Sequence, residues 1–464
     1  MHNTAEDIKQ VFLSQIDQKV KDVNGHAGHV GLKLREYART SFDQGSFPTR
    51  KDEDWKYTSV KAILAEEYNG ASKSEFTCSI PDQFEATTLC FLNGVLVTND
   101  EHKTKVANGG EDNTAAYVSS GSQEGFFAGS LSVAMANPEL KETLSSSVDK
   151  ICNTPMGIFE SMGLGINEDP VCIVIPDNAQ VSKPIHLIYA TDSKDGATAS
   201  HPYALIIVGK NAKAEIVESY LPQADNGVYY TNTASRIFVG ANGHLDHYRL
   251  QVEGKEAFHT AQSTIHQDRD STYGVYIAEL GGKLMRNNIH VSHDSENITS
   301  NIYGLFVVQG SQHMDTQSFI DHAKPHCLSN ELIKGVLHDR GRGVFNGKII
   351  VRPDAQKINA YQHNAALVLS PDAVMDSKPQ LEIFADDVKC SHGATIGQLN
   401  PDALFYLKTR GLSDDAAKTL LKNAFLKDVI DHFPNRDIAL YFESYLEKKL
   451  TQISIKNATE KAIS

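Results

Sequence analysis

"VGKNAKAEIV" (208–217) and "VGANGHLDHY" (239–248) are two similar units in which a turn rich in Gly and Asn runs into a short strand. Two looser copies start at 280 ("LGGKLMRNNI") and 309 ("QGSQHMDTQS"), so the units are separated by about 29 to 41 residues. Short strands that repeat at such a period are typical of a β-solenoid. Because the spacing is irregular, a β-sandwich is the alternative at this point.

The β-rich pattern extends on both sides of these units. Runs such as "VCIVIP" (171–176) and "KIIVR" (348–352) continue it from about 170 to 390, with Gly, Asn and Asp in the turns. No long helical segment separates the runs, which argues against a βαβ fold. We therefore predict a mainly β core over residues 151–390.

Helical segments flank this core. Residues 1–150 are predicted to form a helical or mixed region, in which Trp55, the only tryptophan, anchors the helices to the next domain. In "NPDALFYLKTRG" (400–411), Asn400 is suited to cap a helix and Gly411 to end it, which predicts a C-terminal helical domain over 391–464. Flanking helices or a partner's strands would cover the open ends of a solenoid.

Composition limits the classes of function. The formal net charge of -14 disfavours binding to nucleic acid. No apolar run approaches the roughly 18 residues of a membrane helix, and the N-terminus has no apolar signal core. We therefore expect a cytoplasmic protein without a membrane partner. Its six cysteines include no C-x-x-C pair and are expected to be free thiols.

Several catalytic motifs are missing from the sequence. "GVFNGKII" (343–350) lacks the spacing and the Ser or Thr of a P-loop, and neither G-x-S-x-G nor H-E-x-x-H occurs. We therefore predict that the chain is not an enzyme. The alternative is a β-helix polysaccharide-active enzyme with acids in a groove. Only Asp386 and Asp387 suggest one, and adjacent strand residues face opposite ways.

The stretch "ADDVKCSHGATIG" (385–397) contains the strongest candidate site. Cys390 and His392 are two residues apart, so on a strand both side chains point to the same face. A thiolate beside an imidazole suits zinc, copper or iron. The pair is half a site, because four protein ligands are usual for structural zinc and for iron–sulfur clusters.

Other histidines stand near a cysteine in the sequence. His290 and His293 flank a predicted strand, and His322 and His326 lie in "DHAKPHC", beside Cys327. These residues are suited to bind a metal cluster. We favour the simpler interpretation that they are hydrogen-bonded polar residues in solenoid turns.

Three stretches resemble the SufB/SufD family of iron–sulfur cluster assembly proteins, in its SufD form. They are "FPTRKDEDWKYT" (47–58), "PQLEIFADDVKCSHGATIGQLNPDALFYLKTRGL" (379–412) and the run from 310 to 370. Chains of the SufB type usually carry a glutamate–histidine pattern where this chain has Cys390 and His392. The pair therefore favours the SufD form.

The resemblance implies a right-handed parallel β-helix between the two helical regions. It also implies a scaffold subunit of a SufB–SufC–SufD complex, in which SufC is the ATPase, in agreement with the missing P-loop. The C-terminal helices are expected to bind SufC. His392 corresponds to the SufD histidine implicated in cluster formation at the SufB interface, and Cys390 is the neighbouring candidate. We expect no stably bound cofactor, a transient iron–sulfur cluster shared with SufB, and a homodimer when SufB is absent.

Overall fold

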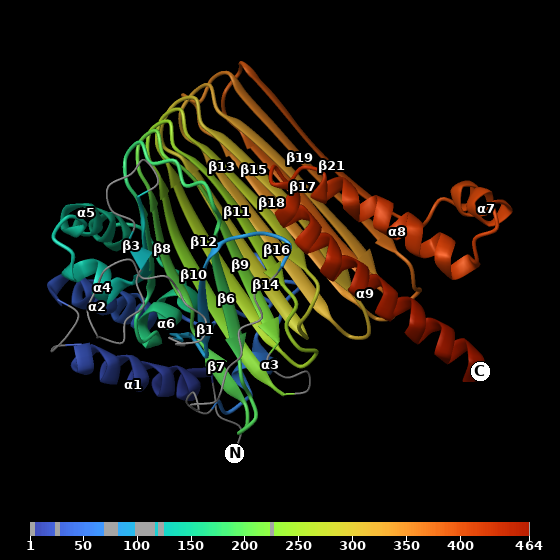
Figure 1. Cartoon of the computed structure of the whole chain (residues 1–464), viewed down its shortest axis with the longest axis horizontal. Coiled ribbons are helices and arrows are strands. Elements are labelled where there is room, and N and C mark those ends of the chain that lie inside the picture. The colour runs from blue at the N-terminus through green and yellow to red at the C-terminus, as the bar shows by residue number, and fades with distance from the viewer. Residues whose placement is uncertain are drawn as a thin grey trace.

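Two long sheets form the centre of the molecule in the computed structural model (Figure 1). The structure describes residues 5–23, 28–68, 82–97, 117–118, 125–222 and 227–463. The ten-stranded sheet has the order β2 (Val95–Leu96), β1 (Thr87–Leu92), β6 (Ile185–Thr191), β9 (Lys213–Pro222), β11 (His244–Gln251), β13 (Thr272–Glu279), β15 (Thr299–Val308), β17 (Leu328–Leu337), β19 (Ile358–Val368) and β21 (Val388–Gly397).

The eleven-stranded sheet faces it. Its order is β20 (Val374–Ile383), β18 (Arg342–Val351), β16 (His313–His322), β14 (Leu284–His293), β12 (Phe258–Gln267), β10 (Tyr229–Val239), β8 (Tyr203–Val208), β5 (Val171–Ile175), β4 (Phe127–Ser130) and β3 (Tyr117–Val118), with β7 (Thr198–Ser200) beside β10. From β8 onward, consecutive strands alternate between the two sheets, and every pairing among them is parallel. This arrangement is a parallel β-helix, which confirms the solenoid and excludes the sandwich.

One turn of each coil contains a residue with left-handed backbone. These residues have φ between 55° and 65° and are Asn178, Asn211, Asn242, Asp270, Asn297, His326 and Lys357. Asn and Asp tolerate this conformation well, which explains why the turns are rich in them. Side chains of the column also bond to one another: the Asn211 amide donates to Asn178 and the Asn242 amide donates to Asn211, both at 2.9 Å.

The interior of the solenoid is filled by stacked apolar side chains. One ladder runs through six consecutive strands of the eleven-stranded sheet, and each member is fully buried: Ile206, Ile237, Ile265, Val291, Ile320 and Ile349. β-branched side chains pack well in such positions because their χ1 is already restricted. The core therefore continues from coil to coil as one cluster.

The N-terminal helices cover the outer face of the eleven-stranded sheet near its first strands. They are α1 (Ala5–Val23), α2 (Gly28–Gln44), α4 (Leu131–Ala136), α5 (Lys141–Cys152) and α6 (Ile158–Ile166), with the short η1 (Glu53–Trp55) and α3 (Lys61–Leu64). Leu34 and Ala38 of α2 pack in one cluster with Leu205 of β8. Trp55 lies 5.4 Å from Phe159 of α6, and the Arg286 guanidinium of β14 stacks 3.7 Å above its ring. The predicted anchoring role of Trp55 is thus confirmed.

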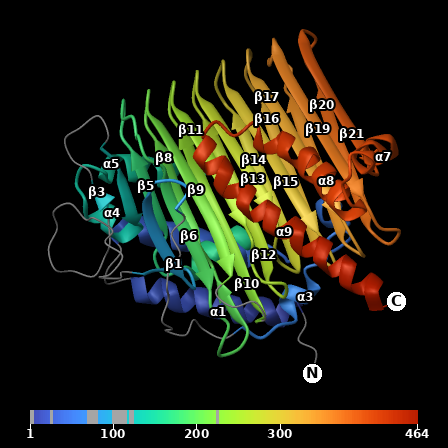
Figure 2. The same cartoon turned by 45° about the vertical axis from the view of Figure 1, so that its right-hand side comes forward.

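The C-terminal helices are α7 (Pro401–Thr409), α8 (Asp414–Ile430) and α9 (Arg436–Ile463). Figure 2 shows α8 and α9 lying across the ten-stranded sheet. Leu426 and Phe442 are buried there in one cluster with Tyr248 and Val336. Helix α7 has no buried residue and stands away from the strands (Figure 1).

Two further expectations concern cysteines and the membrane. Cys90 of β1 is disulfide-bonded, so the expectation that all cysteines are free thiols is wrong for this residue. Cys152, Cys172, Cys327 and Cys390 are free. In the part of the chain that the structure describes, no helix combines the length and the apolar character needed to cross a bilayer.

Candidate functional site

The solenoid ends with two strands that each have only one partner. β21 pairs with β19, and β20 pairs with β18, so each leaves one edge open among the described residues. Unpaired N–H and C=O groups on such an edge can pair with another chain. The candidate residues Cys390 and His392 both lie on β21.

The register of β21 shows where these two side chains point. Cys390 lies opposite Ala360 and His392 lies opposite Gln362, and both partners on β19 are buried inward-facing residues. Cys390 is half-buried and packs against the solenoid core. His392 is exposed, because no further coil covers it. The spacing thus correctly placed both side chains on one face.

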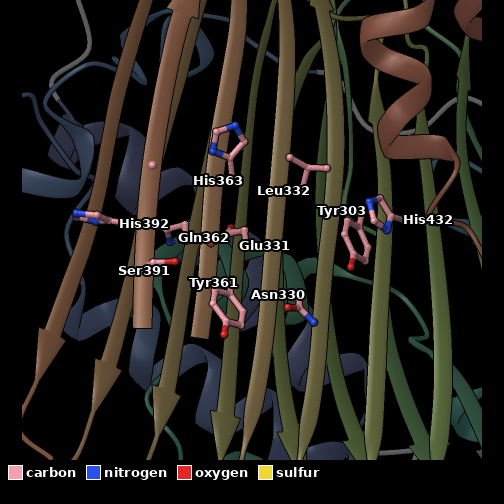
Figure 3. A pocket seen from close by; sticks show the side chains of 11 residues that line it. Tyr303, Asn330, Glu331, Leu332, Tyr361, Gln362, His363, Ser391, His392 and His432 are labelled. Carbon is pink, nitrogen blue, oxygen red and sulfur yellow. Dashed lines mark hydrogen bonds between the residues drawn. The ribbon is translucent and has the colours of Figure 1, made fainter. Parts of the chain in front are cut away.

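A pocket of about 350 Å³ lies beside β21 at the open end of the solenoid (Figure 3). It is lined by Tyr303, Asn330, Glu331, Leu332, Tyr361, Gln362, His363, Ser391, His392, Gly393 and His432. The rings of Tyr303 and His432 stack at 4.2 Å and form one wall. Most lining residues come from β17, β19 and β21, so the pocket follows the last coils of the ten-stranded sheet.

A buried polar pair lies next to His392. The Gln362 amide donates a 2.7 Å hydrogen bond to the Glu331 carboxylate, and the two residues are adjacent in register on β19 and β17. Burial raises the pKa of Glu331 from 4.5 to about 7. The side-chain oxygen of Gln362, Oε1, has no hydrogen-bond partner among the described residues. A carboxyl that titrates near neutral pH therefore lies two strands from the exposed imidazole.

The thiol of Cys390 is protonated at neutral pH. Partial burial raises its pKa, and a hydrogen bond from the Ala360 backbone opposes the shift. A thiol must lose its proton to become a ligand, so metal binding here would release a proton. Within the described residues, no third His, Cys or carboxylate joins Cys390 and His392 at ligand distance. Among the described residues, Cys390 and His392 could therefore supply at most two of four ligands, and their metal role stays a prediction.

The remaining candidates have separate positions. Asp387 is exposed in a turn, where it forms an ion pair with Lys357. His290 packs edge-on against Phe319 at 4.7 Å. His326 is one of the left-handed turn residues. Sequence reasoning missed Glu331 and Gln362, whose inward position follows only from the strand register.

Comparison with known proteins identifies the family. A model described as SUF system FeS cluster assembly, SufBD core domain, matches residues 188–425, and one for the SufBD N-terminal region matches residues 6–187. The chain is 29% identical to the iron-sulfur cluster assembly SufBD family protein slr0076 of Synechocystis, with 92% of this chain and 94% of that protein covered.

Two other relatives are similar over most of their length. Identity is 29% to the chloroplastic protein ABCI7 of Arabidopsis thaliana, over 92% of this chain and 88% of the relative. It is 28% to the iron-sulfur cluster assembly protein SufD of Escherichia coli, over 83% and 85%. Both family models and the parallel β-helix agree, and the chain belongs to the SufBD family of iron–sulfur cluster assembly proteins.

Proposed function

We propose that this chain is the SufD-type, non-catalytic scaffold subunit of a SufB–SufC–SufD complex. A nascent iron–sulfur cluster forms transiently where the β21 edge meets SufB. The observation that carries this proposal is an incomplete pair of ligands, Cys390 and His392, on a strand with an open edge. Four-coordination at iron needs more ligands than this chain offers there, and a partner supplies them.

The open end of the solenoid is suited to bind a similar strand end. Apolar side chains are exposed there, with exposed fractions of 60% for Phe384, 51% for Ile396 and 41% for Ile383. A partner bound here would remove this apolar surface from water, and its strands would form hydrogen bonds with the open strand edges. SufB occupies this surface in the complex, and a second copy of this chain occupies it when SufB is absent.

Helix α7 is the proposed contact with the SufC ATPase. The apolar faces of α8 and α9 are already buried against the ten-stranded sheet, so they are not free for a partner. In α7, Phe405 is 70% exposed and Tyr406 is 56% exposed. Exposed aromatic side chains on one short helix favour docking into a groove of another protein.

The polysaccharide-active alternative loses support from the structure. It needs convergent acids in a groove, whereas Asp387 pairs with Lys357 in an exposed turn. We also propose that no cofactor stays bound after assembly, since the cluster is passed on. A cytoplasmic location stays a prediction.

Anaerobic reconstitution tests this function. Ferrous iron and sulfide are added to the chain alone, to SufB with SufC, and to all three together. We expect cluster absorbance to develop fully only when all three are present. Equal cluster formation by SufB and SufC without this chain would contradict the proposal.

A further inference from the structure

A second group of metal-ligating side chains lies inside the solenoid, away from β21. His293 ends β14, His322 ends β16, and Cys327 directly precedes β17. All three side chains are buried, with exposed fractions of 0%, 0% and 1%. Their ligand atoms all lie within 4.8 Å of one another.

The strand register brings these residues together. His293 and His322 are directly paired across β14 and β16, and both point inward. Cys327 follows His326, whose left-handed φ of 63° turns the chain toward the next strand. The two imidazoles meet with their Nδ1 atoms 3.0 Å apart.

A hydrogen bond on the far side of the His293 ring determines where its proton lies. The Ser300 hydroxyl donates its proton to the side-chain oxygen of Gln267, Oε1. The same hydroxyl must therefore accept a hydrogen bond from His293 Nε2, at 2.7 Å. The Nδ1 of His293 then carries a lone pair directed at His322. His322 Nε2 lies 2.9 Å from the Ser329 hydroxyl, which can donate to it. Without a metal, His322 Nδ1–H then donates to His293 Nδ1 across the 3.0 Å contact. A cation bound between the two rings would take the place of this shared proton.

We propose that His293, His322 and Cys327 form a buried binding site for a divalent transition metal of the zinc class. Zn–N bonds of about 2.0–2.1 Å and Zn–S bonds of about 2.3 Å require ligand atoms roughly 3.3–3.6 Å apart in a tetrahedron. Here the Nδ1 atoms are 3.0 Å apart and no pair of ligand atoms exceeds 4.8 Å, so small side-chain shifts would complete the geometry. The serine hydroxyls orient the rings as partners of metal-bound histidines commonly do. Binding releases the Cys327 thiol proton to solvent and leaves a fourth position for a water or an anion.

A polar pocket of about 770 Å³ borders the site between α5 and the solenoid turns. Four carboxylates line it together with Lys150 and Gln267; they are Glu142, Asp149, Asp268 and Asp294. Gln267 connects this pocket to His293 through Ser300. Because the acids exceed the bases, the pocket raises the local concentration of cations. It would therefore collect metal ions near the buried ligands, and this site is independent of the proposed function.

Cobalt titration tests the site directly. The untagged full chain carries Cys390→Ser and His392→Ala, so the pair on β21 does not contribute, and Co²⁺ is added without oxygen. We expect one equivalent to bind with the visible bands of tetrahedral Co²⁺ and a thiolate-to-cobalt charge-transfer band. Added Zn²⁺ should abolish both. Absence of these bands would overturn the proposal.

Two variants separate the ligands from their neighbours. Cys327→Ser should remove the charge-transfer band and weaken binding by more than about tenfold, the lower end of what losing an orienting partner does. His326→Asn, which keeps a residue that tolerates left-handed backbone, should bind like its parent. An unchanged band in Cys327→Ser would show that the thiolate is not a ligand.

A measurement without ligand substitutions covers the case of a variant that does not fold. X-ray absorption of the zinc-loaded parent should fit two nitrogen ligands and one sulfur ligand near 2.3 Å. Zinc should also raise its Tm, because an ion that binds only the folded state stabilises it. A spectrum with nitrogen and oxygen ligands alone would exclude the site.

Discussion

Gln362 on β19 lies in register with His392 on β21, and its amide donates a 2.7 Å hydrogen bond to the buried Glu331 on β17. The three residues occupy the same position on three successive strands of the ten-stranded sheet. The exposed imidazole of His392 is therefore the last member of a row of polar side chains that begins inside the solenoid with Glu331 and Gln362. Its position and its surroundings are set by the coil register.

The buried carboxyl of Glu331 makes stability depend on pH. Burial raises its pKa to about 7 in the folded protein, from 4.5 for an ordinary glutamate. The folded state then binds more protons than the unfolded state between these values, so the free energy of unfolding falls as pH rises from about 4.5 to about 7. At about 1.4 kcal/mol per pKa unit, the loss is on the order of 3 kcal/mol.

Glu331→Gln should lack this loss. Urea unfolding at pH 5 and pH 8 measures the free energy of unfolding. Its decrease between these two pH values should be smaller in the variant than in the wild type, by roughly 3 kcal/mol. Glu279, whose pKa burial also raises to about 7, keeps its own contribution in both proteins. An equal decline in both proteins would show that Glu331 is charged in the folded state.

Phe405→Asp should weaken binding to SufC without affecting the fold. Phe405 is 70% exposed on α7, so its loss changes no internal packing. Burying a Phe side chain contributes about 1.5–3 kcal/mol, so we expect a loss in affinity of about tenfold or more by titration calorimetry. Leu440→Asp on α9, also exposed, is the matched control. Equal affinity in the two variants would rule out α7 as the contact.

Deleting residues 400–464 is a less specific test of the same contact. The deletion would uncover Tyr248 and Val336 on the outer face of the ten-stranded sheet, which α8 and α9 bury. We therefore expect the truncated protein to aggregate. Loss of SufC binding in it would not identify the contact.

Phe384→Asp should prevent self-association. The wild-type chain alone should sediment as a dimer at micromolar concentration, because its open strand edges pair with those of a second copy. Phe384 follows β20 directly and is 60% exposed, so a charge there opposes burial of this surface. Phe405→Asp should remain dimeric. A wild-type monomer at this concentration would remove the basis for the proposed interface.

The solenoid could be predicted from the sequence, but its exact period could not. The units at 208 and 239 begin the turns β8–β9 and β10–β11, whereas those at 280 and 309 begin β13–β14 and β15–β16. The first pair thus marks one corner of the coil and the second pair the other. The 41 residues between the units at 239 and 280 are longer than one coil because these two units lie at different corners. Similar turn residues at both corners hide this difference.

The candidate site shows the same limit. Same-face spacing was enough to join Cys390 and His392, which lie on one strand. It cannot connect His293 and His322, which lie on different strands. They are 29 residues apart, and only the register between β14 and β16 makes that distance one coil. Glu331 was missed because a single acid in a strand is usually exposed.

Substitution of His392 tests the central claim most directly. The ternary complex with SufB and SufC is assembled with wild-type chain, His392→Ala, Cys390→Ser or His326→Asn, and cluster formation is followed by absorbance under anaerobic conditions. Complex assembly and ATPase rate are measured in parallel. His326→Asn is the control, because His326 is an exposed turn residue at φ 63°.

We predict that His392→Ala lowers cluster formation while complex assembly and ATPase rate stay at wild-type values. Cys390→Ser should have the same effect or a smaller one, and His326→Asn should remain near wild type. Loss of an imidazole ligand from the shared site explains this pattern, since the partner's ligands alone leave the cluster incompletely coordinated. Wild-type cluster formation by His392→Ala in the intact complex would contradict the account and leave this chain an architectural role only.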